Sequence, residues 1–218
     1  MITALILAAG RSARMGTAKQ LLDVGGRSLL SWVIAAAQAS RCDDVLVVVG
    51  EQADRVGREA VAAGVRTVLN PRFADGMGTS IAAGIAALAA ECEAAVILLG
   101  DQPRLDAGAI NALIDAYRSS GKPIVATRTA AALGAPTLIA RPLFAEAAAL
   151  SGDSGGRPLI RRHPDLVVEV AIESDATLWD VDTPEDLKRL RRVLGRKIAK
   201  KDAPSSGAPP SKRHSASS

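Results

Sequence analysis

A nearly uninterrupted apolar run from Ile2 to Leu7 is the feature that most constrains how this chain folds. A strand with so few polar positions is buried on both faces, and it therefore needs strands beside it and layers of structure above and below it. Comparable runs recur at 45–49, 66–69 and 95–99, and segments with helical spacing separate them. This alternation predicts a layered α/β fold with a mostly parallel sheet and right-handed crossovers.

The same pattern continues through the rest of the chain. Helices are expected at 29–39, 55–63, 76–90, 109–117, 141–150 and 160–162, and further strands at 124–127, 136–139 and 167–172. Asn70-Pro71 interrupts the pattern before the third of these helices, which Thr79 or Ser80 can cap at its N-terminus. Thr183, followed by Pro184 and acidic residues, predicts one more helix start.

Length and composition fit a single domain with a core of aliphatic side chains. The chain has 218 residues, of which 48% are hydrophobic and only 2% aromatic. No apolar run approaches the roughly 20 residues that span a bilayer, and the N-terminus lacks a secretion signal, so we expect a soluble cytoplasmic protein without membrane contact. Cys42 and Cys92 are too few for a disulfide framework or a zinc site. His163 and His214 leave little material for a His-based metal site or a Ser-His-Asp triad.

The basic character of the chain comes from its C-terminal end. Residues 195–218 hold six basic residues and one acidic residue, a net charge of +5, which leaves about −1 of the total +4 for residues 1–194. A basic segment rich in Ser, Pro and Gly is typical of a solvated, disordered extension rather than of a nucleic-acid contact. We therefore expect a folded domain at 1–195 and a disordered basic tail at 196–218.

The loop after the first strand combines small residues with three cations. Ala9-Gly10 and Gly16 let backbone N–H groups approach an anion closely, and Arg11, Arg14 and Lys19 can add charge-assisted hydrogen bonds. This combination suits a polyphosphate. The alternative is a turn that only joins a strand to a helix, with its cations in water.

Two common nucleotide loops are excluded by spacing. Gly10 and Gly16 are not followed by the Gly-Lys-Ser/Thr ending of a P-loop, and no G-x-G-x-x-G dinucleotide fingerprint follows the strand. If this loop binds phosphate, it does so in another way.

Two aspartates are candidates for metal binding. Asp101 follows the strand at 95–99 directly, at the edge where ligands bind in a parallel sheet, and Asp182 is a possible second carboxylate. Mg²⁺ typically takes one or two carboxylates together with phosphate oxygens. Asp101 can also be only a turn residue, and Asp182 only part of the helix start after it.

Five motifs occur in an order that resembles the MobA-like nucleotidyltransferase family, over residues 1–194. They are Leu7-Ala8-Ala9-Gly10-Arg11-Ser12-x-Arg14-Met15-Gly16 with Lys19, Gly76-Met77-Gly78-Thr79-Ser80, Gly100-Asp101-Gln102-Pro103, Gly152-Asp153-x-Gly155-x-Arg157 and Asp180-Val181-Asp182-Thr183-Pro184-Glu185-Asp186-Leu187. The Leu-Ala-Ala-Gly opening and Gly-Asp-Gln-Pro are most similar to the molybdenum cofactor cytidylyltransferase branch.

The resemblance implies a Rossmann-like, three-layer α/β/α nucleotidyltransferase. An acceptor phosphate would attack the α-phosphorus of CTP and release pyrophosphate, and the acceptor would be a molybdopterin-type cofactor destined for a molybdenum hydroxylase. The implied nucleotide-binding residues are Leu7, Ala8, Ala9, Gly10, Arg11, Lys19, Gly78 and Ser80; the implied catalytic residues are Arg14, Lys19 and Asp101; and the implied Mg²⁺ ligands are Asp101 and Asp182.

One departure from the family pattern concerns the acceptor. Relatives of the cytidylyltransferase branch often carry Gly-His-Pro where this chain has Gly134-Ala135-Pro136. Transfer with GTP or to another phosphorylated acceptor therefore stays open, and so does a non-catalytic protein that delivers a cofactor. The segment from Gly152 to Arg157 either borders the acceptor or is a structural turn.

Overall fold

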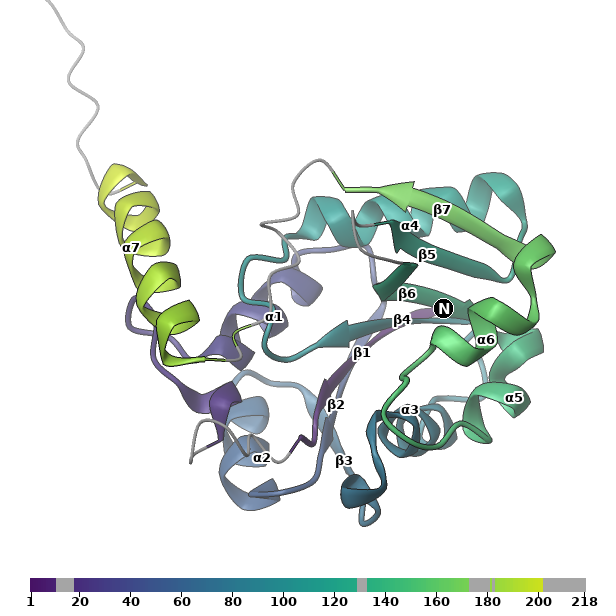
Figure 1. Cartoon of the computed structure of the whole chain (residues 1–218), viewed down its shortest axis with the longest axis horizontal. Coiled ribbons are helices and arrows are strands. Elements are labelled where there is room, and N and C mark those ends of the chain that lie inside the picture. Colours follow the sequence, from purple (N-terminus) through teal and green to yellow (C-terminus); the bar gives the residue numbers. More distant parts are fainter. Residues whose placement is uncertain (11–17, 129–132, 173–180, 182, 202–218) are drawn as a thin grey trace, which may run out of the picture.

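A sheet flanked by helices makes up the body of the molecule (Figure 1). The computed structural model describes residues 1–10, 18–128, 133–172, 181 and 183–201. In these segments seven strands form one sheet in the order β3-β2-β1-β4-β6-β5-β7. The strands are β1 (Ile2–Ala8), β2 (Asp44–Val49), β3 (Arg66–Leu69), β4 (Ala94–Leu99), β5 (Ile124–Arg128), β6 (Leu133–Ala140) and β7 (Val167–Ala171).

The sheet is parallel except for one strand. β1 lies between β2 and β4 and is parallel to both, β3 is parallel to β2, and β7 is parallel to β5. β6 runs antiparallel between β4 and β5. The predicted mostly parallel α/β sheet is confirmed. The apolar run at 136–139 indicated an extended segment but carried no information on its direction.

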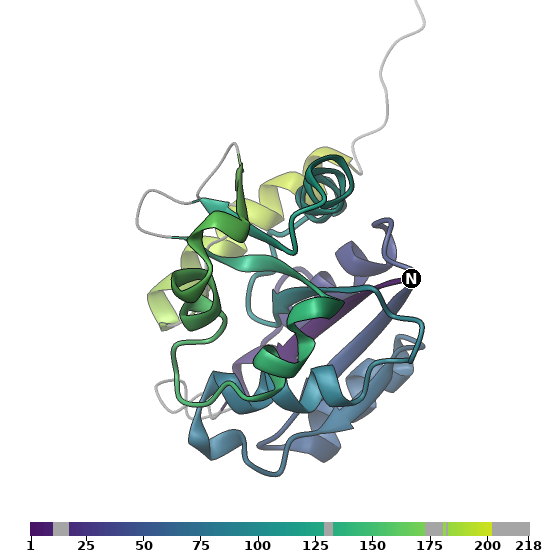
Figure 2. The same cartoon turned by 90° about the vertical axis from the view of Figure 1, so that its right-hand side faces the viewer.

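Helices cover both faces of the sheet. α1 (Leu29–Gln38), α2 (Ala53–Ala62) and α4 (Ala107–Ser120) pack on one face. α3 (Met77–Ala86), α5 (Phe144–Ala148) and α6 (Arg157–Arg162) pack on the other. Figure 2 shows α4 and α3 on opposite sides of the strands. The three-layer arrangement expected from the sequence is therefore present.

β1 is buried on both faces, as its apolar run predicted. Ile2, Ala4 and Ile6 contribute to the core under α1 and α4, whereas Leu5 and Leu7 contribute to the core under α3. All seven residues of the strand are buried. Among the described residues, no helix has the length and apolar character needed to cross a bilayer.

The N-terminus of α3 differs from the prediction. The helix begins at Met77, with Gly76 as its N-cap, and ends at Ala86, so the expected capping role of Thr79 or Ser80 and the expected end near residue 90 are wrong. Gly76 has a φ of 102°, a conformation that favours glycine, and the chain enters the helix there because Gly76 and Gly78 pack against another loop. Thr79 and Ser80 thus lie inside the first turns.

α7 (Pro184–Lys201) begins as the sequence predicts. The Thr183 hydroxyl accepts from Asp186 N–H at 3.1 Å, and the Asp186 carboxylate accepts from Thr183 N–H at 2.9 Å, which is the reciprocal pattern of a capping box. Leu187 and Leu190 pack on a small cluster that includes Val24. The helix runs through Lys201, so the expected domain boundary at residue 195 lies inside it.

Candidate functional site

The carboxyl ends of β1 and β4 lie side by side, and the residues after them border a pocket of about 410 Å³. Gly100 N–H donates to the Leu7 carbonyl at 3.0 Å, which holds the two strand ends together. The pocket is lined by Leu7, Ala9, Gly10, Lys19, Gln20, Phe73, Ala74, Gly76, Met77, Ser80, Leu99, Asp101 and Asp153. This is the edge at which parallel α/β sheets bind ligands.

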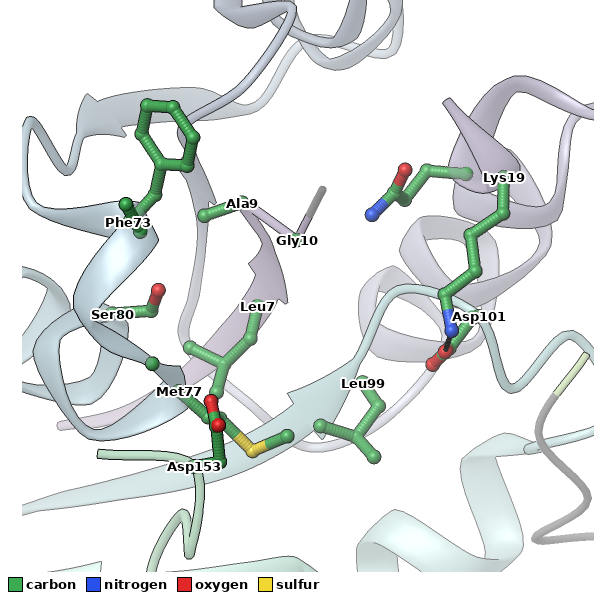
Figure 3. A pocket seen from close by; sticks show the side chains of 13 residues that line it. Leu7, Ala9, Gly10, Lys19, Phe73, Met77, Ser80, Leu99, Asp101 and Asp153 are labelled. Atoms are coloured by element: carbon green, nitrogen blue, oxygen red, sulfur yellow. Dashed lines mark ion pairs between the residues drawn. The ribbon is translucent and has the colours of Figure 1, made fainter. Parts of the chain in front are cut away.

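Lys19 and Asp101 form an ion pair on one side of this pocket (Figure 3). Lys19 begins a short 3-10 helix, η1 (Lys19–Leu21), and Asp101 follows β4. Their side chains are only 17% and 13% exposed, and charges with so little solvent need partners. An ammonium beside a carboxylate suits a polyphosphate that carries a divalent cation, because the first attracts phosphate and the second metal.

The backbone of Asp101 is tied to the segment that precedes α7. Val181 N–H donates to the Asp101 carbonyl at 3.3 Å, and Val181 is fully buried. Asp182 is the next residue in the chain, but it lies outside the described residues, as do Arg11 and Arg14. The roles that the sequence assigned to those three residues stay predictions.

The opposite side of the pocket is formed by η2 (Phe73–Asp75) and the start of α3. Figure 3 shows Phe73, Met77 and Ser80 across the pocket from the Lys19 and Asp101 pair, with Leu7 and Leu99 between the two sides. One side of the pocket thus carries the Lys19 and Asp101 ion pair, and the other carries apolar groups, the Ser80 hydroxyl and the Asp153 carboxylate. A pocket divided in this way suits a nucleotide, which has an anionic end and an aromatic end.

Asn70 holds this second side in place. Its side chain is buried, and its amide donates to the hydroxyls of Thr79 and Ser80 at 2.9 and 3.0 Å. The sequence pattern identified Asn70-Pro71 only as a break between elements. No spacing signal connected Asn70 with the α3 motif, because the contact depends on the return of the chain after β3.

Close backbone packing joins the start of α3 to the loop at 151–153. Gly78 N–H donates to the Gly152 carbonyl at 2.8 Å, and Gly152 N–H donates to the Asp75 carbonyl at 3.0 Å. A Cβ atom on Gly78 would lie 2.6 Å from the Ser151 nitrogen. Gly78, predicted to bind nucleotide, is therefore buried against this loop, while Ser80 lines the pocket.

A second pocket of about 190 Å³ adjoins the first. It shares Met77, Leu99 and Asp153 with the first pocket. Its other lining residues are Ile81, Ile97, Gly134, Ala135, Thr137, Ile139, Ser154, Gly155, Gly156 and Arg157. The two segments that the sequence linked to a possible acceptor, around Gly134 and from Gly152 to Arg157, are thus brought together beside the nucleotide-sized pocket.

The first pocket collects most of the predicted residues that the structure describes. Leu7, Ala9, Gly10, Lys19, Ser80 and Asp101 all line it. Ala8 is buried in the core on the other face of the sheet. The sequence did not identify Gln20, Phe73 or Leu99, which come from three separate segments and share no spacing.

Asp101 is the predicted metal ligand that the structure describes, and Asp153 is a second carboxylate on the lining of the pocket. In the part of the chain that the structure covers, no three His, Cys, Asp or Glu side chains form a group that could hold an ion. The Asp101 carboxylate at the pocket, with a side chain that is 13% exposed, is nevertheless compatible with Mg²⁺, which is commonly bound through one or two carboxylates and the phosphates of its nucleotide.

A mostly parallel α/β sheet with a charged pocket at its carboxyl edge is the architecture of the Rossmann-like class. Residues 4–167 match the family model described as the MobA-like NTP transferase domain, and the chain belongs to this family. The resemblance inferred from the five motifs is thereby confirmed at the family level.

Three relatives show how far the similarity extends. Nicotine blue oxidoreductase of Paenarthrobacter nicotinovorans is 31% identical over 87% of this chain and 96% of its own length. Purine catabolism protein PucB of Bacillus subtilis is 30% identical over 87% of this chain and 96% of its own length. The crystal structure of Rv0371c from Mycobacterium tuberculosis H37Rv in complex with manganese has a TM-score of 0.74 at 30% identity, covering 88% of this chain and 98% of that one.

Proposed function

We propose that this protein is a Mg²⁺-dependent cytidylyltransferase that transfers CMP from CTP to the phosphate of a molybdopterin-type cofactor. The observation that carries the proposal is the pairing of Lys19 and Asp101 in a pocket of nucleotide size, next to a second pocket that shares its wall. The choice of CTP and of molybdopterin rests on the Leu-Ala-Ala-Gly and Gly-Asp-Gln-Pro motifs.

In the proposed reaction, an acceptor phosphate oxygen attacks the α-phosphorus of CTP. The new phosphorus–oxygen bond forms as the bond to the β-phosphate breaks, and pyrophosphate leaves with the electron pair. No protein nucleophile takes part, because positioning and charge stabilisation dominate such transfers.

Lys19 would bind the β- and γ-phosphates, aided by Arg11 and Arg14 from the same loop. Asp101, and Asp182 with it, would hold Mg²⁺, which neutralises phosphate charge when bound. The manganese in the Rv0371c crystal structure supports a divalent metal in this family.

The second pocket would bind the acceptor. Arg157 and the backbone of Gly155 and Gly156 offer donors suited to a phosphate, and Ile81, Ile97 and Ile139 offer an apolar surface. Ala135 stands where the cytidylyltransferase branch that this chain resembles often carries histidine, and it offers no side-chain hydrogen bond to the acceptor.

The test is pyrophosphate release with each of the four NTPs, with and without molybdopterin. We expect turnover with CTP and acceptor, and a loss of about 100-fold or more in D101N, as for other groups that stabilise transition-state charge. The matched control is D115N, on the exposed outer side of α4, where Asp115 pairs with Arg41. Its turnover should match that of the unaltered protein.

The outcomes also separate the alternatives. Turnover with GTP, or with another phosphorylated acceptor only, would keep the nucleotidyltransferase class and replace the substrate. Tight molybdopterin binding without pyrophosphate release from any NTP would favour a delivery protein. Retention of Lys19 and Asp101 together argues against that role, because a carrier does not need a phosphate and metal set.

A further inference from the structure

Every hydrogen-bonding atom of the Asn70 side chain has a partner. The residue is only 2% exposed and lies between β3 and α3. Its Nδ2 donates to Thr79 Oγ1 at 2.9 Å and to Ser80 Oγ at 3.0 Å, and its Oδ1 accepts from Arg72 N–H at 2.9 Å. The amide therefore connects the turn after β3 with two hydroxyls of α3.

The neighbours of Asn70 determine which way its amide points. If the amide were turned over, its NH₂ group would face Arg72 N–H, and two donors would meet. The surroundings of Thr79 Oγ1 require the same orientation of the Asn70 amide. This oxygen lies 2.8 Å from the carbonyl oxygens of Arg72 and Gly76. Carbonyls only accept, so the Thr79 hydroxyl donates to them and must accept from Asn70.

This orientation fixes the role of the Ser80 hydroxyl. Ser80 Oγ accepts from Asn70, so its own hydrogen remains available for donation, and no acceptor for it exists among the residues that the structure describes. Ser80 is 5% exposed and lines the pocket beside Phe73, across from Lys19 and Asp101 (Figure 3). The free hydrogen is thus available to a ligand at the end of the pocket away from the charged pair.

We infer that Asn70 is a positioning residue that makes Ser80 a dedicated hydrogen-bond donor to the nucleobase. The inference rests on the proposed nucleotide-binding function of the pocket. A fixed hydroxyl donor forms a hydrogen bond with a ring carbonyl oxygen. An amino group at the same position binds less well, because two donors would then face each other without solvent. Asn70 therefore contributes to base selectivity without touching the base.

The test is a double-mutant cycle on CTP affinity, measured by calorimetry with N70D, S80A and the double variant. In N70D the new carboxylate keeps the hydrogen bond from Arg72 N–H. Unlike the amide, it has no hydrogen to donate to Ser80, so the Ser80 hydroxyl donates to the carboxylate and its hydrogen points away from the base. We expect CTP affinity to fall about tenfold in N70D and in S80A, the loss typical of one buried hydrogen bond. In the S80A background, N70D should cause no further loss.

A structural or electrostatic role for Asn70 predicts a different result. Loosening of α3, or repulsion between a carboxylate and the phosphates, would weaken CTP binding in the S80A background as well, and this outcome would overturn the inference. Thermal unfolding checks that each variant is folded. If N70D does not fold, N70A takes its place in the cycle, with the same requirement that its effect vanish in S80A.

The experiment also separates this inference from the proposed function. If the unaltered protein binds none of the four NTPs, both fail together. If it binds CTP and the effects of N70D and S80A are independent, only the role of Asn70 is overturned.

Discussion

At the scale of single residues, Lys19 differs from the other described cations because it lines the first pocket and is also paired with the Asp101 carboxylate. We predict that K19M weakens CTP binding by about tenfold or more, since a charge-assisted hydrogen bond to phosphate is lost. CMP lacks the β- and γ-phosphates, so its affinity should change much less. Calorimetry with both nucleotides measures the difference.

K122M is the matched control for this prediction. Lys122 is an exposed lysine just after α4, and its replacement should leave both affinities unchanged. Equal losses of CTP and CMP affinity in K19M would show that Lys19 supports the pocket as a whole and does not bind the terminal phosphates.

At the scale of elements, the contact between α3 and the loop at 151–153 links the two pockets. We predict that G78A destabilises the fold by about 1–3 kcal/mol, as overpacking usually does, because its Cβ would lie 2.6 Å from the Ser151 backbone. Since the loop continues into residues that line both pockets, KM values for nucleotide and acceptor should rise together. Chemical unfolding and steady-state kinetics measure the two effects.

G57A provides a control with the same chemical change. Gly57 lies inside α2, and a Cβ there would meet nothing within 4 Å. This variant should be about 0.4–1 kcal/mol more stable, because alanine reduces the entropy of the unfolded chain. A stable G78A variant with unchanged KM values would show that the loop and the helix adjust independently.

α5 and the end of α6 are joined by an ionic contact that depends on pH. Glu146 lies 3.0 Å from His163 Nε2 and accepts from Arg162 at 2.7 Å. Hydrogen bonds from His163 first, and from Arg162 second, lower the pKa of Glu146 below its ordinary value of 4.5. The folded state thus favours the ionised carboxylate, so this contact stabilises the protein above pH 4.5 and loses its effect as the pH falls through the lowered pKa.

We therefore predict that the stability difference between the unaltered protein and E146Q shrinks between pH 6 and pH 3. Urea unfolding across this range measures it. The difference should be small and should fall with added salt, because the contact is exposed. E91Q, at an exposed glutamate before β4, is the control for the removal of one surface carboxylate. A difference that is constant with pH would contradict the prediction.

At the scale of the whole molecule, the sequence predicted the strands better than the site. Apolar runs located β1 and β4 because burial on both faces leaves a strong local signal, and the residues directly after them, such as Asp101, were found for the same reason. Phe73 and Asp153 line the pocket only because distant segments meet there. Such contacts depend on tertiary packing, which no local pattern contains.

The error at the start of α3 has the same origin. Thr79 and Ser80 are good capping residues by type, but Asn70 engages both hydroxyls, and Gly76 begins the helix where the loop at 151–153 approaches. Tertiary packing at the start of α3 therefore outweighed the capping preference of Thr79 and Ser80. The motif was recognised correctly, while the reason for its glycines and hydroxyls required the fold.

The C-terminal helix divides into a part that supports the site and a part that extends beyond it. Leu187 and Leu190 pack in a cluster with Val181, whose backbone is bonded to Asp101. We predict that a protein ending at Gly195 keeps CTP turnover within about twofold of the full chain. Leu187 and Leu190, the buried residues among the α7 side chains that the structure describes, precede that point, and the removed residues are mainly basic and polar. L190A, by contrast, should lower stability by about 2–5 kcal/mol, as other large-to-small changes in a core do, and should lower turnover by loosening the segment beside Asp101. Pyrophosphate release and thermal unfolding of both variants measure this. A large loss of turnover on truncation, with stability unchanged, would mean that the basic residues after Gly195 act in catalysis or substrate binding and that the folded domain is not the whole of the active unit.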